Sequence, residues 1–302
     1  MDTITYTHAL GKLIEVNGKT LWVEEEGSGE ALILLPGGPA ASHLTFHPYF
    51  SALADRFRVI YYDYYGRGKS GRPEDYKDIT FMGDVEDLEG LRQALGLESF
   101  NLYGFSYGGM VAQEYALTYG ARVKKLILAN TLHSPEMWQK NHENIYREIS
   151  LQYPDVYEII DNLRKQGVRS DDPRMLQAFS VHSRIIRFYN PDNAAKLLKE
   201  EHSNNLDLYW TFVGNDIDFF VGGQVAQLPD FRPRLKDLRM PVLILAGRYD
   251  RALYPAYQYQ FKQYCPQATF LMMERSGTYA HIEETDLLME TVGSFLRQSY
   301  QA

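Results

Sequence analysis

One serine in this sequence stands in a setting that suits nucleophilic chemistry. Ser106 is the centre of a Gly-x-Ser-x-Gly pattern, Gly104–Gly108, which follows the apolar run Phe100–Tyr103 and begins a helical pattern over Tyr107–Tyr119. Flanking glycines permit a sharp strand-to-helix turn with a strained serine backbone. Such a turn exposes the hydroxyl beside a helix N-terminus, which stabilises developing negative charge. The pattern predicts that Ser106 is a nucleophile; the alternative is a glycine-rich turn with an incidental serine.

A serine hydroxyl needs a base to activate it, and the base needs an acid to orient it. Asp250 is the candidate acid because it comes just after the apolar run Val242–Ala246. His281 is the candidate base, since it is the one histidine near the start of the last helical pattern, Thr285–Leu296. Two plainer alternatives stay open: the aspartate could cap a turn, and the histidine could cap a helix or pack in the core.

The elements that must position these side chains have the order of an α/β protein. Two alternating stretches, Lys12–Val16 and Thr20–Glu26, are separated by Asn17-Gly18 and predict a hairpin. Continuous apolar runs then alternate with helical patterns, which predicts a mostly parallel sheet with helices on both faces. The runs are Ala31–Leu35, Arg58–Tyr62, Phe100–Tyr103, Lys125–Ala129, Val242–Ala246 and Thr269–Met273, and the helical patterns are Met82–Leu95, Tyr107–Tyr119 and Thr285–Leu296.

The alternation of strands and helices stops between His133 and Lys236. A stretch this long is not a loop within a compact domain, and Trp138–Tyr153 and Pro154–Gly167 have helical patterns. Ligands of open α/β sheets bind at the carboxyl ends of the strands. We therefore predict a core formed by residues 1–132 and 237–302, and a helical cap, 133–236, over the active site.

Composition excludes several classes of function. The 302 residues include 31 basic and 39 acidic side chains, a net charge of −8, and nucleic-acid binders usually have a basic surplus. The single cysteine excludes an intrachain disulfide framework and a thiolate zinc cluster. No apolar run approaches the ~20 residues of a membrane helix, and the first residues lack a signal-peptide pattern. We expect a soluble, cytoplasmic protein without metal, cofactor, nucleic-acid or membrane partners. The remaining histidines, expected at the surface or lining a pocket, are His43, His47, His133, His142, His182 and His202.

Four motifs together resemble those of α/β-hydrolases of the prolyl aminopeptidase group, which includes the proline iminopeptidases. Leu35–Ala40 is similar to the group's His-Gly-Gly-Pro-Gly, and Asp63–Ser70 to its Asp-x-x-Gly-x-Gly-x-Ser loop. Gly104–Gly109 matches its nucleophile turn, and Gly247–Asp250 its acid strand. The resemblance covers nearly the whole chain and is weakest in the cap. It implies an α/β-hydrolase fold and a serine hydrolase that cleaves an N-terminal Pro or other small residue from peptides or amides.

The resemblance also assigns roles to residues. It implies that Ser106 is the nucleophile and Asp250 the acid. The backbone N–H groups of Tyr107 and of Gly37 or Gly38 would form the oxyanion hole. Each donor aimed at the tetrahedral intermediate is worth ~3 kcal/mol.

The base departs from the pattern of the group. Its members usually carry the catalytic histidine directly after a glycine and five residues before a glutamate. Counting back from Glu283 gives Thr278, and threonine cannot act as a base near neutral pH. Either the loop Ser276–Ala280 is rearranged so that His281 reaches Ser106, or the base is missing.

Recognition of a substrate amine is the second departure. Aminopeptidases of this group commonly bind the ammonium with acidic residues from the cap and from beside the catalytic aspartate. Here Arg251 follows the aspartate, while Asp218 falls near the position of the acidic cap residue, with Asp216 close by. The two acids could equally be solvated loop residues, and the arginine could bind a substrate carboxylate or pair with Asp218.

Three functions remain open from the sequence. The first is a proline iminopeptidase-like hydrolase that acts on a small peptide or amide. The second keeps the chemistry but acts as an esterase, lactonase or amidase on a neutral or acidic small molecule. The third is a base-deficient protein of the same fold that binds its ligand without efficient turnover.

Overall fold

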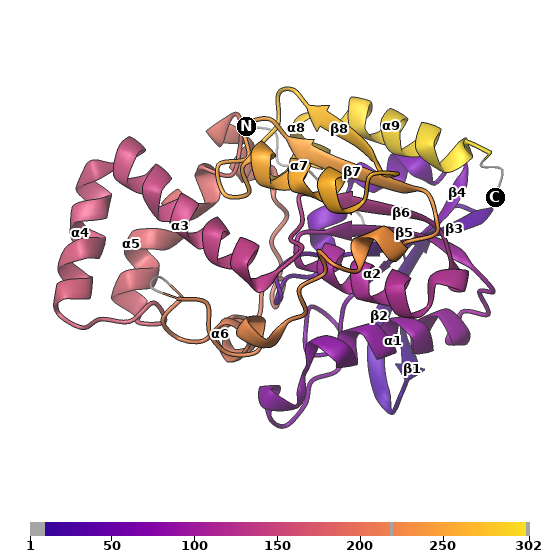
Figure 1. Cartoon of the computed structure of the whole chain (residues 1–302). Coiled ribbons are helices and arrows are strands. Elements are labelled where there is room, and N and C mark those ends of the chain that lie inside the picture. Colours follow the sequence, from indigo (N-terminus) through magenta and orange to yellow (C-terminus); the bar gives the residue numbers. More distant parts are fainter. Residues whose placement is uncertain (1–9, 218–219, 300–302) are drawn as a thin grey trace.

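The computed structural model describes residues 10–217 and 220–299 and is built around an eight-stranded sheet of order β1-β2-β4-β3-β5-β6-β7-β8 (Figure 1). β1 and β2 form the predicted hairpin, and β2 is antiparallel to β4, whereas all later pairings are parallel. The predicted mostly parallel sheet is confirmed. The strands are β1 Lys12–Val16, β2 Lys19–Glu26, β3 Glu30–Leu35, β4 Phe57–Tyr62, β5 Phe100–Phe105, β6 Val123–Ala129, β7 Val242–Gly247 and β8 Thr269–Met273.

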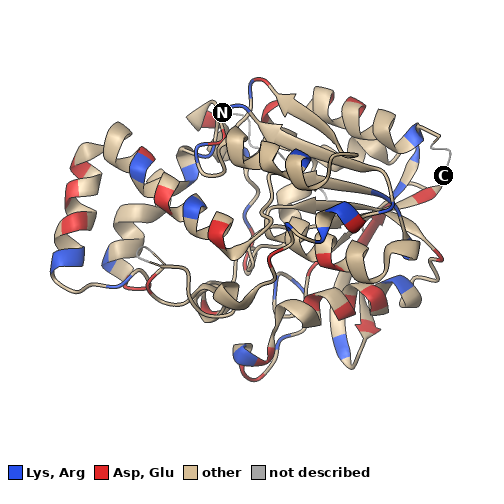
Figure 2. Cartoon of the chain, in the orientation of Figure 1, with Lys and Arg blue, Asp and Glu red and all other residues tan. Residues whose placement is uncertain are grey.

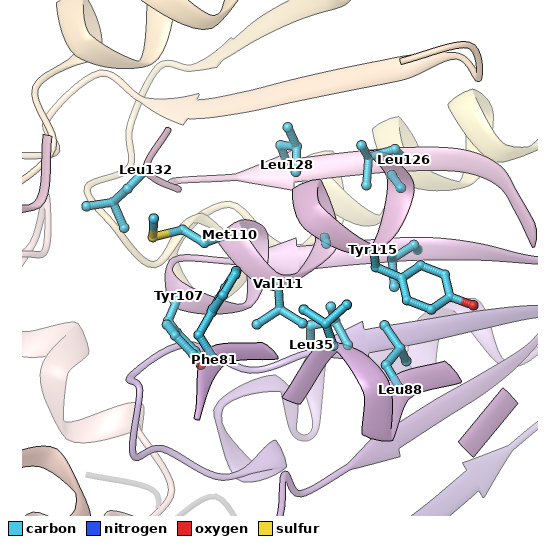
Figure 3. Packing of buried hydrophobic residues seen from close by; sticks show 14 of the residues in the cluster. Leu35, Phe81, Leu88, Tyr107, Met110, Val111, Tyr115, Leu126, Leu128 and Leu132 are labelled. Carbon is cyan, nitrogen blue, oxygen red and sulfur yellow. The ribbon is translucent and has the colours of Figure 1, made fainter. Parts of the chain in front are cut away.

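The central strands are buried on both faces, which explains their continuous apolar runs. In β3, Ile33 and Leu35 pack in one hydrophobic cluster with α1, α2 and α7, while Leu32 and Leu34 pack in a second cluster with α9. Successive side chains of a strand point to opposite faces, so one run supplies both clusters. Figure 3 shows Leu35 beneath Val111 of α2. The flanking helices are α1 Phe81–Ala94, α2 Tyr107–Thr118, α7 Pro255–Tyr264, the short α8 Ala280–Glu283 and α9 Thr285–Arg297.

Helices between β6 and β7 lie beside the sheet, on the left in Figure 1. They occupy the stretch assigned to the cap and include two helices, α5 and α6, that the sequence patterns did not predict. Ile149, Ile160 and Met175 belong to a separate hydrophobic cluster that joins α3, α4 and α5, and Figure 2 shows charges of both signs along α3 and α4. These helices are α3 Pro135–Gln152, α4 Pro154–Lys165, α5 Pro173–Ile185 and α6 Leu206–Val213. Within the described ranges, no helix combines the length and apolar character of a membrane span.

Candidate active site

Ser106 lies at a strained turn between β5 and α2. Its backbone has φ 53° and ψ −120°, a sparsely populated region that costs about 1–3 kcal/mol for a non-glycine residue. The flanking glycines allow the turn because there is no space for a side chain: a Cβ on Gly108 would lie 2.2 Å from the carbonyl oxygen of Leu35, and one on Gly104 would lie 2.6 Å from Cα of Gly109. The predicted sharp strand-to-helix turn is present, with the serine half-buried at its tip.

Two backbone segments lie beside the serine where an oxyanion would form. Gly37 and Gly38 line the same cavity as Ser106, and a Cβ on Gly37 would lie 3.1 Å from the serine Cβ. Tyr107 is the first residue of α2, where backbone N–H groups have no partner within the helix. The assignment of these N–H groups to an oxyanion hole stays a prediction, and the positions of the segments support it.

A buried network fixes the start of α2. The Tyr107 hydroxyl donates to Oδ2 of Asp84 at 2.5 Å, and Arg67 donates to both carboxylate oxygens at 2.8 Å. Burial raises the pKa of Asp84, and the guanidinium beside it only partly offsets this effect. Figure 3 shows the tyrosine ring packed beside Phe81 of α1. The residue after the nucleophile is thus anchored through its side chain.

A second buried network holds His43 and His47, which follow the glycine loop in the chain. Asp63, the first residue of the Asp-x-x-Gly-x-Gly-x-Ser motif, accepts the backbone N–H of His43 at 2.8 Å and contacts its Nδ1 at 2.9 Å. Glu24 contacts Nε2 of His43 at 3.0 Å and Nε2 of His47 at 3.1 Å. Burial lowers the pKa of His43, but the two carboxylates outweigh it and raise this pKa to about 9. Both histidines are buried in the core, so their expected place at the surface or in a pocket is wrong.

Asp250 lies where the acid was predicted, just beyond β7, and is 1% exposed. Its Oδ1 accepts the backbone N–H groups of Ala252 at 3.0 Å and Leu253 at 2.8 Å, and its Oδ2 accepts Nδ2 of Asn130 at 2.9 Å. Burial raises the pKa of this carboxyl, although these donors act in the opposite direction. Asn130 directly follows β6, and its place at the carboxyl end of a neighbouring strand was a usable signal that sequence analysis missed.

Thr278 occupies the position beside the acid that an imidazole would need. Its hydroxyl donates to Oδ1 of Asp250 at 3.0 Å, and its backbone N–H donates to the carbonyl of Arg187 at 2.7 Å. Thr278 lines the same cavity as Ser106. A threonine hydroxyl cannot take the serine proton at neutral pH, so this geometry favours the alternative in which the base is missing.

The geometry does not support His281 as the base. Its ring, 1% exposed, lies among Phe46, Phe50 and Phe105, with ring centroids 5.3–6.1 Å away. The imidazole bonds to the backbone of Thr45, and its Nε2 has no hydrogen-bond partner among the described residues. The loop rearrangement that would bring His281 to the nucleophile is absent, because α8 turns the ring into the second hydrophobic cluster instead.

Comparison with known proteins identifies the family. The family described as alpha/beta hydrolase fold matches residues 30–285. The proline iminopeptidase of Heyndrickxia coagulans is 30% identical over 276 residues, 90% of this chain and 92% of that protein. The chain belongs to the α/β-hydrolase family. The proline iminopeptidase of Saccharolobus solfataricus is 28% identical to this hydrolase over 282 residues, 91% and 87% of the two chains. The solved proline iminopeptidase of Mycobacterium smegmatis has a TM-score of 0.78 at 23% identity and covers 96% of this chain and 98% of that one. The predicted fold and the resemblance to the prolyl aminopeptidase group are confirmed.

The structure of this α/β-hydrolase gives Arg251 a different place from the one expected. Its Nη1 donates to the carbonyl of Phe188 at 3.1 Å, and its Nε lies 3.9 Å from Glu148. It is not among the residues that line the cavity. The side chain thus holds the segment at Phe188, and substrate binding by Arg251 stays a prediction.

Of the two acids predicted to bind an amine, Asp218 lies outside the described residues. Asp216 is described, and its Oδ1 is buried without a hydrogen-bond partner among the described residues. The next residue, Ile217, lines the cavity. Because a buried, unpaired carboxylate oxygen is costly, Asp216 stays a candidate for amine recognition.

A single cavity of about 400 Å³ joins these elements of the hydrolase. It extends from Ser106 to the cap helices and has both apolar and polar walls. His142, expected at the surface or lining a pocket, is one of the side chains that line it. Sequence analysis missed two others, Arg184 and Arg187, which belong to the end of the unpredicted α5 and the residues after it. Other lining residues are Leu44, Thr45, Leu132, Trp138, Asn141, Ser170, Met175, Phe179, Ser183, Lys199, Tyr209, Trp210 and Tyr279.

We expect the His281→Leu variant to lose less unfolding free energy on acidification than the unmodified protein does. Its catalytic activity should be nearly unchanged. Burial lowers the pKa of His281 to about 4, whereas in the unfolded chain it is ~6.5. Between these values the unfolded state binds a proton that the folded state does not. Stability is therefore lost as pH falls from ~6.5 to ~4, by up to about 3 kcal/mol.

Urea unfolding at pH 7 and pH 4.5 measures this difference for the two proteins. The fall in unfolding free energy on acidification should be smaller in the leucine variant. Hydrolysis of a prolyl arylamide should stay within a few-fold of the unmodified enzyme. A folded variant that loses a hundredfold or more of its activity would show instead that His281 is the base.

Proposed function

We propose that this α/β-hydrolase is a serine hydrolase that cleaves an N-terminal proline, or another small N-terminal residue, from a short peptide or amide. The observation that carries the proposal is the strained Ser106 turn, which shares one cavity with Gly37, Gly38 and Thr278. Asp250 lies directly behind that cavity and bonds to the threonine. The names of the curated relatives, proline iminopeptidases, supply the substrate class.

The reaction begins when Oγ of Ser106 attacks the carbonyl carbon of the N-terminal residue. The carbonyl oxygen becomes negative and is stabilised by the N–H groups of Tyr107 and of Gly37 or Gly38. The carbon–nitrogen bond then breaks, and the amine leaves with the proton that the serine has lost. Water finally hydrolyses the acyl ester and restores the serine hydroxyl.

Proton transfer is the slow part of this scheme. The proton must move from the seryl oxygen to the leaving nitrogen, and a positioned imidazole speeds such transfers by ~10²–10⁴-fold. Of the residues bonded to Asp250, Thr278 is the one that lines the cavity, and it cannot hold the proton in transit. We therefore expect hydrolysis by the unmodified protein to be slow and to depend on oxyanion stabilisation and substrate positioning.

A second candidate function follows from the same residue. The hydroxyl of Thr278 satisfies Asp250, and the imidazole of His281 is committed to the core. A site with these features still binds the substrate and stabilises an oxyanion, but lacks an activated nucleophile. The protein would then bind its ligand without efficient turnover.

Replacing Asp216 by asparagine tests amine recognition. A carboxylate next to the cavity stabilises the substrate ammonium, so the variant should show a KM raised about tenfold for a prolyl arylamide. A short acyl ester has no ammonium, and its KM should be unchanged. Steady-state kinetics on the two substrates gives both values, and an equal rise for both would rule out amine binding by Asp216.

A further inference from the structure

The cavity of this hydrolase is lined by cationic side chains on its cap side. Arg184, Arg187 and Lys199 line it, and no aspartate or glutamate does so among the residues that the structure describes. The protein as a whole has the opposite balance, with a net charge of −8. The positive charge of the cavity is therefore a local feature and not a consequence of composition.

The two arginines come from the end of one helix. Arg184 is in the last turn of α5. Arg187 comes just after that helix, and its own backbone carbonyl accepts the N–H of Thr278. Both side chains are half-buried, and within residues 10–217 and 220–299 neither forms an ion pair. Half-buried guanidinium groups elsewhere do pair, as Arg58 does with Glu25 and Arg232 with Glu136.

The charge of Arg187 acts across the reaction centre. It favours the ionised form of Asp250 and of Tyr279, and it disfavours protonation of His142. Arg184 also favours the ionised form of the same tyrosine. Tyr279 lines the cavity next to Thr278, and both arginines line this same cavity with Ser106.

A buried imidazole on α3 supplies an independent sign of a polar ligand. His142 is 5% exposed and lines the cavity, and its Nδ1 has no hydrogen-bond partner among the described residues. Burial, together with Arg187, lowers the pKa of His142 to about 3, so the ring is neutral at pH 7 and a weak base. A neutral imidazole can donate one N–H to an anion, as can the amide of Asn141, which lines the same wall.

We propose that Arg184 and Arg187, with His142, form a subsite that binds a carboxylate of the substrate. Arginine pairs with carboxylate through two parallel hydrogen bonds, and a partly buried, unpaired guanidinium gains most from such a ligand. A cavity of about 400 Å³ suits a molecule the size of a dipeptide. The inference rests on the proposed function for the bond that is cleaved, and it adds that the substrate is a small molecule with a free carboxylate.

The carboxylate can belong to either side of the scissile bond. On the leaving side, it is the C-terminus of a dipeptide such as Pro-Ala, whose other end is the prolyl group that Ser106 attacks. On the acyl side, it is the end of a short dicarboxylic chain. The arginines serve the same chemistry in both cases, so two pairs of probes are needed.

The first pair is Pro-Ala and Pro-Ala-NH₂, which differ only in the carboxylate. Calorimetric binding to the Ser106→Ala protein avoids turnover. We expect Pro-Ala to bind at least ~10-fold more tightly, and Arg187→Gln and Arg184→Gln to remove most of this preference. Arg187→Lys keeps the charge but not the paired hydrogen bonds, and should retain part of it. Arg174→Gln is the matched control, because Arg174 is an exposed residue at the other end of α5 that pairs with Asp172.

The second pair is the 4-nitrophenyl monoester of succinic acid and 4-nitrophenyl butyrate, compared by kcat/KM in the Thr278→His protein. A carboxylate preference that the glutamine variants erase, in either pair, supports the subsite and identifies the side of the bond. The subsite is overturned if the two members of each pair bind or react equally well. It is also overturned if the arginine variants change both members of a pair to the same extent. Failure of the proposed function gives a different result, because no substrate would then show Ser106-dependent hydrolysis while carboxylate binding persisted.

Discussion

Replacing Thr278 by histidine is expected to raise kcat/KM for a prolyl arylamide by ~10²–10⁴-fold, the usual contribution of a positioned general base. The hydroxyl of Thr278 already contacts Asp250 at 3.0 Å, and the residue lines the cavity that holds Ser106. An imidazole at that position can donate one N–H to the carboxylate and accept the seryl proton at its other nitrogen. The substitution thus completes an arrangement whose other members are in place.

The size of the gain should depend on the leaving group. An arylamide nitrogen must receive a proton before it leaves, whereas 4-nitrophenolate leaves without one. The histidine at position 278 should therefore accelerate amide hydrolysis more than 4-nitrophenyl ester hydrolysis. Thr278→Val is the matched control: it removes the hydroxyl without adding a base, and no gain is expected. Adding Ser106→Ala to the Thr278→His protein should abolish the gain for both substrates.

Labelling by a fluorophosphonate separates the two candidate functions of the unmodified protein. The probe reacts with an activated serine. Labelling of the unmodified protein at a rate near that of the Thr278→His variant would support turnover as the natural function. If only the variant is labelled, the natural protein binds without efficient turnover. Absence of labelling and of any gain in the folded variant would contradict the role of Ser106 itself.

The sequence predicted the sheet and the sharp turn at Ser106 well because both depend on local physics. β3 has a continuous apolar run since both of its faces are buried, with Leu34 and Leu35 in opposite hydrophobic clusters. The turn at Ser106 requires glycines at Gly104 and Gly108, where no side chain fits. Asp250 was chosen as the candidate acid only from its place just beyond a buried strand. In each case, the residue type reports directly on its surroundings.

The base and the cap were less predictable because their surroundings are formed by residues distant in the sequence. Nothing in the spacing of His281 distinguishes a catalytic imidazole from one packed among phenylalanines, and its burial is visible only after η2 (Tyr49–Leu53) and α9 have packed around α8. Thr278 was found as a departure from a family motif, so that signal came from resemblance and not from its chemistry. The arginines near the end of α5 had no motif at all, since their meaning depends on the cavity they line.

Replacing Asp250 by asparagine should lower kcat far more in one background than in the other. In the Thr278→His protein, the carboxylate holds the imidazole in the tautomer that can accept the seryl proton, so its loss should lower kcat by up to ~10⁴-fold. In the unmodified protein there is no imidazole to orient at this position, and the same substitution should change kcat by only a few-fold. The two single changes and the double change form a cycle whose coupling measures the interaction directly.

Stability must be separated from catalysis in that cycle, because Asp250 is buried and accepts hydrogen bonds from Asn130, Ala252 and Leu253. An asparagine oxygen can keep the bonds on one side but not on both, so urea unfolding should show a loss of about 1–3 kcal/mol in both backgrounds. Asn130→Ala is the matched control: it removes one donor to the same carboxylate and should destabilise the fold while largely sparing the gain from histidine. Equal loss of kcat in both backgrounds would mean that the aspartate only supports the loop. A loss confined to the Thr278→His background would mean that Asp250 can orient a base at position 278, although this chain has a threonine at that position.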